Sequence, residues 1–480
     1  MTDDQRGLSR RSVLRGAAVG GLATATSLGG VGVAAAADMY RIRLDQPRQT
    51  LWGLGFEIQS DSIGSGSSGL PASTSSVPFD LTAAERDRLV EQMLKVRPDR
   101  GFRYCRLALG LYLRGTNAAG TQMTERFSGQ AAGLASLIAD ANIEGVSAEY
   151  WSPAPAWKSN NSFIGGTLRA TDGTFLDQFT SALATDVRYL RDHGIPVRMW
   201  GLQNEPEYST SYSSCTYTDE LYHQTFRRAA PKIHAIDPSI IVTADSSNGW
   251  SGKGSAQILA DPTTLAQVDA WTYHRIGYDS NYQIDHDFVG PARGKTVFNN
   301  EFEYLDNNLR CVNTAQSIMN WMTFQSAPTW FWLHALKPTT NSESPGYGLG
   351  YWRPPSDTDF SRFPDIAPGH WVFNDANWNA VAGFVRFMPW DSRRIQVDEP
   401  AVLKDQRIMA WTTPQGKPVF AVTNRSTTQS FSYTVDTSTS SGFSGFRYGP
   451  TTNTQPLGSK PGPVLNITVP ADSIEFWVRN

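Results

Sequence analysis

The chain has 480 residues, more than one small hydrophobic core can organise, so we expect one large domain and a smaller second domain. Its net charge is −3 and it has no basic stripe, which argues against nucleic acid as a partner. Aromatic residues make up 11% of the chain, with 15 Trp, a composition that suits carbohydrate binding through stacking on indole rings and equally suits a large core.

The three cysteines allow at most one internal disulfide, and they lack the spacing of a zinc site. Cys105 lies in an apolar run and is expected to be an inert core residue. Cys215 and Cys311 are expected in loops, where they could pair. The sequence alone leaves that pairing open.

Residues 1–37 are predicted to be a targeting segment. Arg10 and Arg11 form a twin-arginine pattern, and a weakly apolar Gly/Ala-rich run follows and ends at Ala35–Ala37. This run has no stretch of bulky apolar residues long enough to span a bilayer. We therefore expect a cleavable twin-arginine export signal, a secreted protein and no membrane partner.

The mature chain is predicted to begin with a strand at residues 40–44, where apolar and polar residues alternate, and to leave that strand at Pro47. Residues 38–50 are expected to join the smaller domain. Strands then alternate with helices. The predicted strands cover residues 51–58, 102–107, 146–150, 197–206, 240–244, 268–274, 295–301 and 329–334. The predicted helices cover residues 82–96, 131–142, 174–193, 218–236, 314–325 and 378–387.

Two helix features follow from single residues. Thr82, with Glu85 three residues later, predicts an N-cap for the first helix. Pro231 predicts a bend or break in the fourth helix, because proline removes one backbone donor.

This alternation predicts an α/β fold, a (β/α)8 TIM barrel over residues 51–390. From Arg394 the pattern changes to short strands separated by Gly, Asn and Thr turns, which predicts an all-β sandwich over residues 391–480. Its predicted strands include residues 408–412, 418–423, 431–435 and 473–478.

Two glutamates are the leading candidates for catalysis. Asn204 and Glu205 follow the fourth barrel strand, and Pro206 ends its ladder. A carboxylate at the C-terminal end of a barrel strand is in the usual catalytic position, although a lone Asn-Glu-Pro fits an ordinary loop equally well. Glu301 ends the seventh strand. Glu303 shares its face, but Glu301 ends the apolar run directly and is favoured.

Two carboxylates at one barrel mouth, with indoles nearby, indicate glycoside hydrolysis. One acid protonates the leaving oxygen while the other attacks the anomeric carbon, which requires carboxyl groups about 5–5.5 Å apart in a retaining enzyme. No cofactor or metal is expected, because two carboxylates suffice and the seven histidines show no ligand spacing.

The chain resembles a known group of enzymes. Asn204–Pro206 and a glutamate that ends strand seven are similar to the signature of the clan of barrel-fold retaining glycosidases. Trp151–Pro153 with Trp157, Gly383–Phe387 and Ser392–Ile395 resemble motifs of glycoside hydrolase family 30. The resemblance spans nearly all of the mature chain and implies a barrel with a β-sandwich beside it, to which the strand before the barrel contributes.

The resemblance also implies roles for individual residues. Glu205 would be the acid/base and Glu301 the nucleophile. Asn204 would contact the sugar 2-hydroxyl, and Arg106 would hold the nucleophile ionised, although a structural ion pair is an alternative for Arg106.

Further residues are implied around the sugar. Trp151 and Trp332 would be walls of the subsite, with barrel core as the alternative for each, and Trp330 fits core as well as it fits the site. His274, at the end of strand six, would orient a carboxylate or bind a hydroxyl, with a core histidine as the alternative.

The sequence departs from the family at two places. Ile276 stands where the family commonly has an aromatic residue, and Tyr278 could substitute for it. Strand one ends without the expected Gly/Ala-rich turn, so that Glu57 and Asp61 put acids near the mouth and Glu57 becomes a candidate substrate-binding residue. These departures predict a divergent member of the family.

We expect a secreted retaining β-glycosidase with a carbohydrate substrate. The sequence leaves the oligomeric state open, with a monomer favoured. A non-catalytic carbohydrate-binding protein and a transglycosylase on the same scaffold are the alternatives. Retention of both glutamates at strand tips argues against the first alternative. The sugar would depend on three loops, residues 60–78, 160–171 and 339–368.

Overall fold

The computed structural model describes residues 39–58, 81–95, 100–248, 252, 254–275, 280–286, 294–303, 309–340, 345–355 and 357–480. The predicted export signal and the loop of residues 60–78 lie outside the described residues. Among the helices that are described, none combines the length and apolar character that a bilayer crossing requires.

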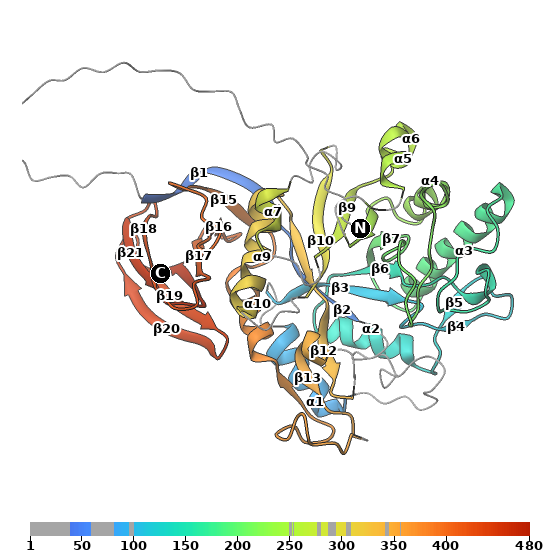
Figure 1. The fold of residues 1–480 in the computed structure, drawn as a ribbon, viewed down its shortest axis with the longest axis horizontal. Coiled ribbons are helices and arrows are strands. Elements are labelled where there is room, and N and C mark those ends of the chain that lie inside the picture. The colour runs from blue at the N-terminus through green and yellow to red at the C-terminus, as the bar shows by residue number, and fades with distance from the viewer. Residues whose placement is uncertain are drawn as a thin grey trace, which may run out of the picture. The chain divides into compact units, whose positions relative to one another are not determined.

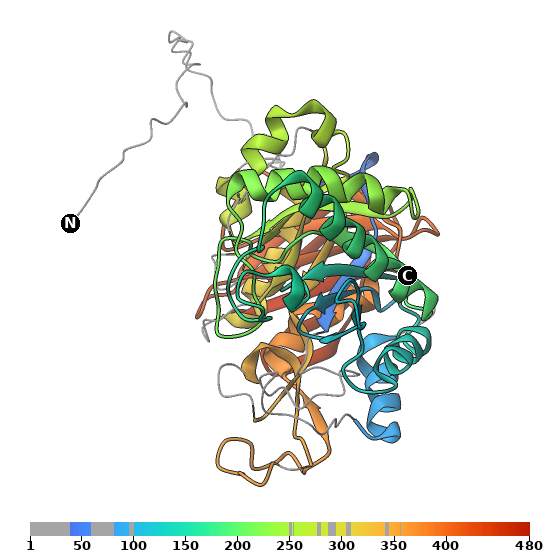
Figure 2. The same ribbon diagram turned by 90° about the vertical axis from the view of Figure 1, so that its right-hand side faces the viewer.

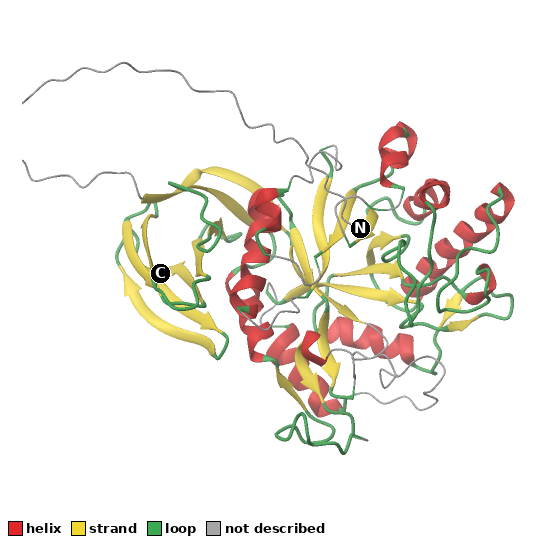
Figure 3. Cartoon of the chain, viewed as in Figure 1, coloured by secondary structure: helices red, strands yellow, loops and turns green. Residues whose placement is uncertain are grey.

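Eight parallel strands close into a barrel in the order β10-β11-β2-β3-β6-β7-β8-β9 (Figures 1 and 3). Their bounds are β2 Gly53–Ile58, β3 Phe102–Leu109, β6 Gly145–Tyr150, β7 Val197–Gly201, β8 Ile241–Ser247, β9 Ala270–His274, β10 Thr296–Phe302 and β11 Thr329–Trp332. The strands are buried along almost their whole length, as expected for parallel strands that are covered by helices. The predicted barrel is confirmed.

Helices cover the outside of the barrel, with α3 and α4 side by side in green in Figure 2. Their bounds are α1 Ala83–Leu89, continued by a π-helical turn Val90–Leu94, α2 Gln130–Asp140, α3 Gly173–Asp192, α4 Asp219–His234, α5 Ser255–Ala260, α6 Pro262–Leu265, α7 Tyr282–Asp285, α9 Arg310–Phe324 and α10 Asp375–Phe387. Short 3-10 turns are found at Pro155–Trp157 and Pro345–Tyr347. The Thr82 hydroxyl accepts from the Glu85 amide at 3.3 Å, which confirms the predicted N-cap.

Two helix predictions need correction. The fourth helix is not broken at Pro231, because α4 continues to His234; the proline lies in the last turn, where it removes a single backbone bond. Cys311 lies in α9 and not in a loop, since this helix begins at Arg310. All three cysteines are buried and free, so Cys215 and Cys311 do not pair.

The C-terminal region forms a nine-stranded sheet in the order β20-β19-β22-β17-β16-β15-β1-β18-β21 (Figure 1). Its strands are β1 Met39–Leu51, β15 Ser392–Asp398, β16 Ile408–Thr412, β17 Pro418–Asn424, β18 Phe431–Asp436, β19 Phe443–Gly449, β20 Thr452–Lys460, β21 Val464–Val469 and β22 Ser473–Arg479. A separate hydrophobic core, with Phe420, Leu465 and Trp477, lies within the sheet. The predicted all-β second region is therefore confirmed.

The first strand is longer than predicted. β1 pairs antiparallel with β15 and parallel with β18, and it does not end at Pro47. Its register with β15 shifts on both sides of Pro47, so the proline sits at an irregularity where no ladder donor is required.

Two small sheets complete the fold. β12 His334–Pro338, β13 Gly348–Trp352 and β14 Trp371–Phe373 form one, and β4 Gly115–Thr116 and β5 Met123–Thr124 form the other. The eighth barrel strand ends at Trp332, so His334 belongs to β12 and not to the barrel as predicted.

Helix α10 packs against β22 at a glycine. A Cβ atom added to Gly383 would lie 2.0 Å from Cε2 of Phe476. The Phe476 ring is wholly buried and packs edge-on against Phe384 at 5.0 Å, so it has no room to move aside. This close approach joins the barrel to the nine-stranded sheet.

We predict that Gly383→Ala lowers the free energy of unfolding by about 1–3 kcal/mol, because the extra methyl overpacks this contact. Gly133→Ala in α2 is the matched control, since no atom lies within 4 Å of its added Cβ and alanine favours a helix. Urea unfolding of both variants measures the difference. Equal stability of Gly383→Ala and the wild type would contradict the packing described here.

Candidate active site

One buried arginine joins the ends of four barrel strands. Arg106, on β3, is wholly buried, and its Nε and Nη2 donate to Glu149 on β6 at 2.8 and 2.5 Å. Its Nη1 donates to Glu57 on β2 at 2.5 Å and to Glu301 on β10. Burial alone would lower the pKa of Arg106, but Glu149, Glu57 and Glu301 together raise it above its ordinary value. The guanidinium is therefore a permanent cation among three carboxylates.

The same guanidinium contacts two more of the predicted site residues. Its Nη2 donates to the Asn204 side-chain oxygen at 2.6 Å. Its Cζ lies 4.4 Å from the centre of the Trp151 ring, within the range of a cation–π contact. Because Asn204 uses its oxygen on Arg106, its amide nitrogen remains as the group that can donate to a ligand.

Glu205 occupies a different environment from Glu301. Its φ of +43° is rare for a residue other than glycine, and its amide donates to the Ser246 carbonyl at 3.0 Å. Its Oε1 lies 3.1 Å from Nδ1 of His274. Burial raises the pKa of Glu205 to about 7; Arg106 opposes that rise and Glu149 adds to it. The carboxyl group can therefore hold a proton near neutral pH.

His274 is wholly buried, and burial lowers the pKa of its ring even though Glu301 favours the charged form. The Asn300 amide donates to the Ser246 hydroxyl at 2.8 Å, and this hydroxyl lies 3.1 Å from His274 Nε2. The hydroxyl can donate to Nε2, which assigns the ring proton to Nδ1 and directs it at Glu205. A relay from Asn300 through Ser246 to His274 thus orients the Glu205 carboxyl group.

Two backbone irregularities deliver these side chains. The pairing of β10 with β9 shifts between Asn299 and Glu301, and both Asn300 and Glu301 contact residues of the site although they are adjacent. Asp245 and Ser246 have φ values of +80° and +67° at the end of β8. Such conformations cost roughly 1–3 kcal/mol each and cluster at functional sites.

Glu205, His274 and Glu301 each place one atom within 4.8 Å of the others. Among the described residues, this is the group whose possible ligand atoms lie close enough together to hold one metal ion. However, Arg106 already contacts Glu301, and its Nη2 lies 3.4 Å from His274 Nε2, so a positive charge already occupies this position. The predicted absence of a metal stays a prediction.

The other candidates lie around this centre. Glu303 is buried, and burial together with Glu301 raises its pKa well above the ordinary value. Trp332 is wholly buried beside Trp330 and donates to the Tyr347 carbonyl at 2.8 Å. Trp330 is also wholly buried and donates to Ser317 on α9 at 3.3 Å, as its core alternative implies. The wall role of Trp332 stays a prediction.

Three residues that contact the centre were not predicted from the sequence: Glu149, Ser246 and Asn300. Glu149 did carry a signal, because it is a charged residue in an otherwise apolar strand. Ser246 was missed because the fifth strand was predicted to end at Ala244, and Asn300 because the shift in β10 leaves no trace in the sequence. Asp61, Ile276 and Tyr278 lie outside the described residues.

Known proteins match this chain in structure and not in sequence. No protein-family model matches the chain, and no curated protein sequence matches it. Solved structures do match. A glycoside hydrolase family 30 subfamily 8 xylanase from Clostridium acetobutylicum has 20% identity and a TM-score of 0.65, covering 92% of this chain and 99% of that one.

Two further structures match over the same share of the chain. The catalytic domain of the family 30 xylanase C from Talaromyces cellulolyticus has 17% identity and a TM-score of 0.67, covering 92% of this chain and 100% of that one. The endo-β1,6-glucanase BT3312 has 14% identity and a TM-score of 0.68, covering 92% of this chain and 93% of that one. The chain therefore has the fold of family 30 enzymes, and the predicted resemblance is confirmed for the fold.

Proposed function

We propose that this protein is a retaining β-glycosidase that hydrolyses O-glycosidic bonds of a polysaccharide or oligosaccharide. The observation that carries the proposal is the pair Glu205 and Glu301. One carboxyl oxygen of each lies within 4.8 Å of the other. Glu205 contacts the ring of His274, whereas Glu301 contacts the cation Arg106. A retaining mechanism needs two such carboxyl groups about 5–5.5 Å apart. The solved structures that share the fold include xylanases and a glucanase, which supports this reaction class.

In the first step Glu205 is the acid and Glu301 the nucleophile. His274 donates to Oε1 of Glu205, so the acidic proton resides on Oε2 and is free to pass to the leaving oxygen. Arg106 donates to Glu301, which stabilises that carboxylate as an anion for attack on the anomeric carbon. The free amide nitrogen of Asn204 is placed to donate to the sugar 2-hydroxyl, a bond that strengthens in the transition state.

In the second step Glu205 acts as a base and no longer as an acid. Esterification removes the negative charge of Glu301, and Glu205 has already lost its proton to the leaving group. The Glu205 carboxylate then accepts a proton from water, which attacks the anomeric carbon and releases Glu301. Two displacements at one carbon return the β configuration.

The substrate is proposed to be a β-linked polymer such as a galactan, xylan or glucan, or a glycoside with an acidic side group. The twin-arginine pattern at Arg10 and Arg11 supports export from the cell, where such polymers are found. A screen of the purified protein against nitrophenyl glycosides and a polysaccharide panel tests the reaction class directly. Failure to cleave any glycoside, combined with binding of a polysaccharide, would favour a non-catalytic binding protein.

We predict that Glu301→Ala reduces turnover by roughly three orders of magnitude or more, because the covalent step is lost. Added azide should restore activity to this variant and form the α-glycosyl azide. In Glu205→Ala the intermediate still forms, so azide should yield the β-glycosyl azide there. Glu303→Ala is the matched control and should retain activity. If Glu303→Ala is inactive and Glu301→Ala is active, the nucleophile is Glu303 and not Glu301.

We predict that activity falls as the pH rises through about 7, because Glu205, whose pKa burial raises to about 7, must be protonated to act as the acid. Ser246→Ala should lower kcat about 10-fold or more and move this basic limb to higher pH. Without the hydroxyl, the His274 proton can shift to Nε2, and Nδ1 then accepts from the neutral Glu205 carboxyl group and raises its pKa further.

Thr272→Val is the control for this variant, since it also removes a buried hydroxyl, one that donates to the Ala244 carbonyl at 3.3 Å. Its pH profile should match that of the wild type. A Ser246→Ala variant with reduced kcat and an unmoved basic limb would show that the hydroxyl serves packing and not the orientation of His274.

A further inference from the structure

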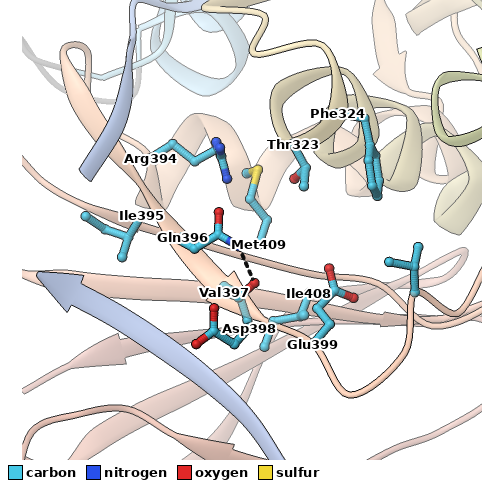
Figure 4. Close-up of a pocket in the computed structure, with 11 residues that line it drawn as sticks. Thr323, Phe324, Arg394, Ile395, Gln396, Val397, Asp398, Glu399, Ile408 and Met409 are labelled. Atoms are coloured by element: carbon cyan, nitrogen blue, oxygen red, sulfur yellow. Dashed lines mark hydrogen bonds between the residues drawn. The ribbon is translucent and has the colours of Figure 1, made fainter. Parts of the chain in front are cut away.

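A pocket of about 430 Å³ lies where the C-terminal end of α9 meets the strands β15 and β16 (Figure 4). Thr323 and Phe324 of α9 form one side, and Arg394 and Gln396 of β15 with Met409 of β16 form the other. None of the residues that line it belongs to the carboxylate centre of the barrel. Its volume is in the range of small-molecule sites.

Arg394 is a buried cation among the residues that line this pocket. Only 6% of the residue is exposed, and its Nε donates to the Gln49 side-chain oxygen at 2.8 Å. Within the described part of the chain, no carboxylate forms an ion pair with it. Burial, with a smaller contribution from the nearby cation Arg48, lowers the pKa of Arg394 to about 10. Its two terminal nitrogens are thus left without a charged acceptor.

The acids that line the pocket do not supply this acceptor, because other arginines already hold them. Asp398 accepts from Arg43 at 3.0 Å. Glu399 accepts from both terminal nitrogens of Arg407 at 2.8 and 2.9 Å. Of the three charged residues that line the pocket, Arg394 is therefore the one without an ion pair among the described residues. A buried cation of this kind is costly unless an anion joins it.

We propose that this pocket binds a uronic acid residue, whose carboxylate pairs with the two terminal nitrogens of Arg394. The planar guanidinium matches a carboxylate in a bidentate geometry. The Thr323 hydroxyl, which has no hydrogen-bond partner among the described residues, offers a group for a sugar hydroxyl, while Phe324 and Met409 offer apolar surface for the ring face. The choice of a sugar rests on the proposed function; the need for an anion does not.

Binding of D-glucuronate to the full mature chain, measured by isothermal titration calorimetry at constant ionic strength, tests this assignment. We expect the wild type to bind glucuronate, with D-glucose and inorganic phosphate at least 10-fold weaker. Arg394→Gln should weaken glucuronate binding at least 10-fold. Arg393→Gln is the matched control and should bind as the wild type does, because this neighbour is exposed and donates to Thr50 at 2.8 Å.

Gln396→Glu provides a second variant in case Arg394→Gln does not fold. It is isosteric, places a carboxylate in the pocket and should also weaken binding at least 10-fold. The proposal is overturned if wild-type protein does not bind glucuronate, if glucose or phosphate binds as tightly, or if both variants bind as the wild type does. These outcomes are independent of hydrolysis, so a protein that binds glucuronate but cleaves no glycoside would count against the proposed function alone.

Discussion

The site depends on the ion pairs that the buried guanidinium of Arg106 forms. It is one cation, wholly buried, and it donates to carboxylates from β2, β6 and β10 while its own strand is β3. A buried carboxylate without its cation is strongly destabilising, typically by 3–5 kcal/mol when one partner of a pair is removed. Arg106 therefore holds four strand ends together and, through the same contacts, sets the charge of the site.

This arrangement gives two glutamates of the same barrel mouth different partners. Glu301 contacts the cation directly, whereas Glu205 contacts a histidine that burial keeps neutral. Environments that separate the behaviour of two carboxyl groups are the means by which one site supplies both an acid and a nucleophile. The strained end of β8 brings Ser246 to the histidine, and the register shift in β10 brings Asn300 to Ser246, so both backbone irregularities help to orient the histidine.

The barrel could be predicted from the sequence because its strands are apolar runs that end in polar residues. The same pattern predicted that Glu205 and Glu301 lie at strand ends. Buried parallel strands need largely apolar runs, and that constraint is visible in residues 197–201, where Arg198 alone is exposed, and in residues 296–298. The edge strand β20 was not predicted, because Thr452–Lys460 is largely exposed and has no apolar pattern.

The parts of the site that could not be predicted depend on backbone geometry. A register shift beside Asn300 and the φ of Ser246 arise from contacts between strands that are distant in sequence. Pro47 shows the same limit, since only the register of the neighbouring strand reveals that β1 passes through it. Side-chain contacts such as those of Glu149 likewise appear only when the strand ends converge.

The stereochemistry of the first product tests the central claim most directly. An NMR time course of hydrolysis of a β-linked substrate, recorded before the anomers equilibrate, should show the β-hemiacetal first, because Glu301 and water each displace once at the same carbon. The appearance of the α-anomer first would mean a single displacement and an inverting enzyme, whose carboxyl groups lie about 6.5–9.5 Å apart. That result would remove the nucleophile role from Glu301.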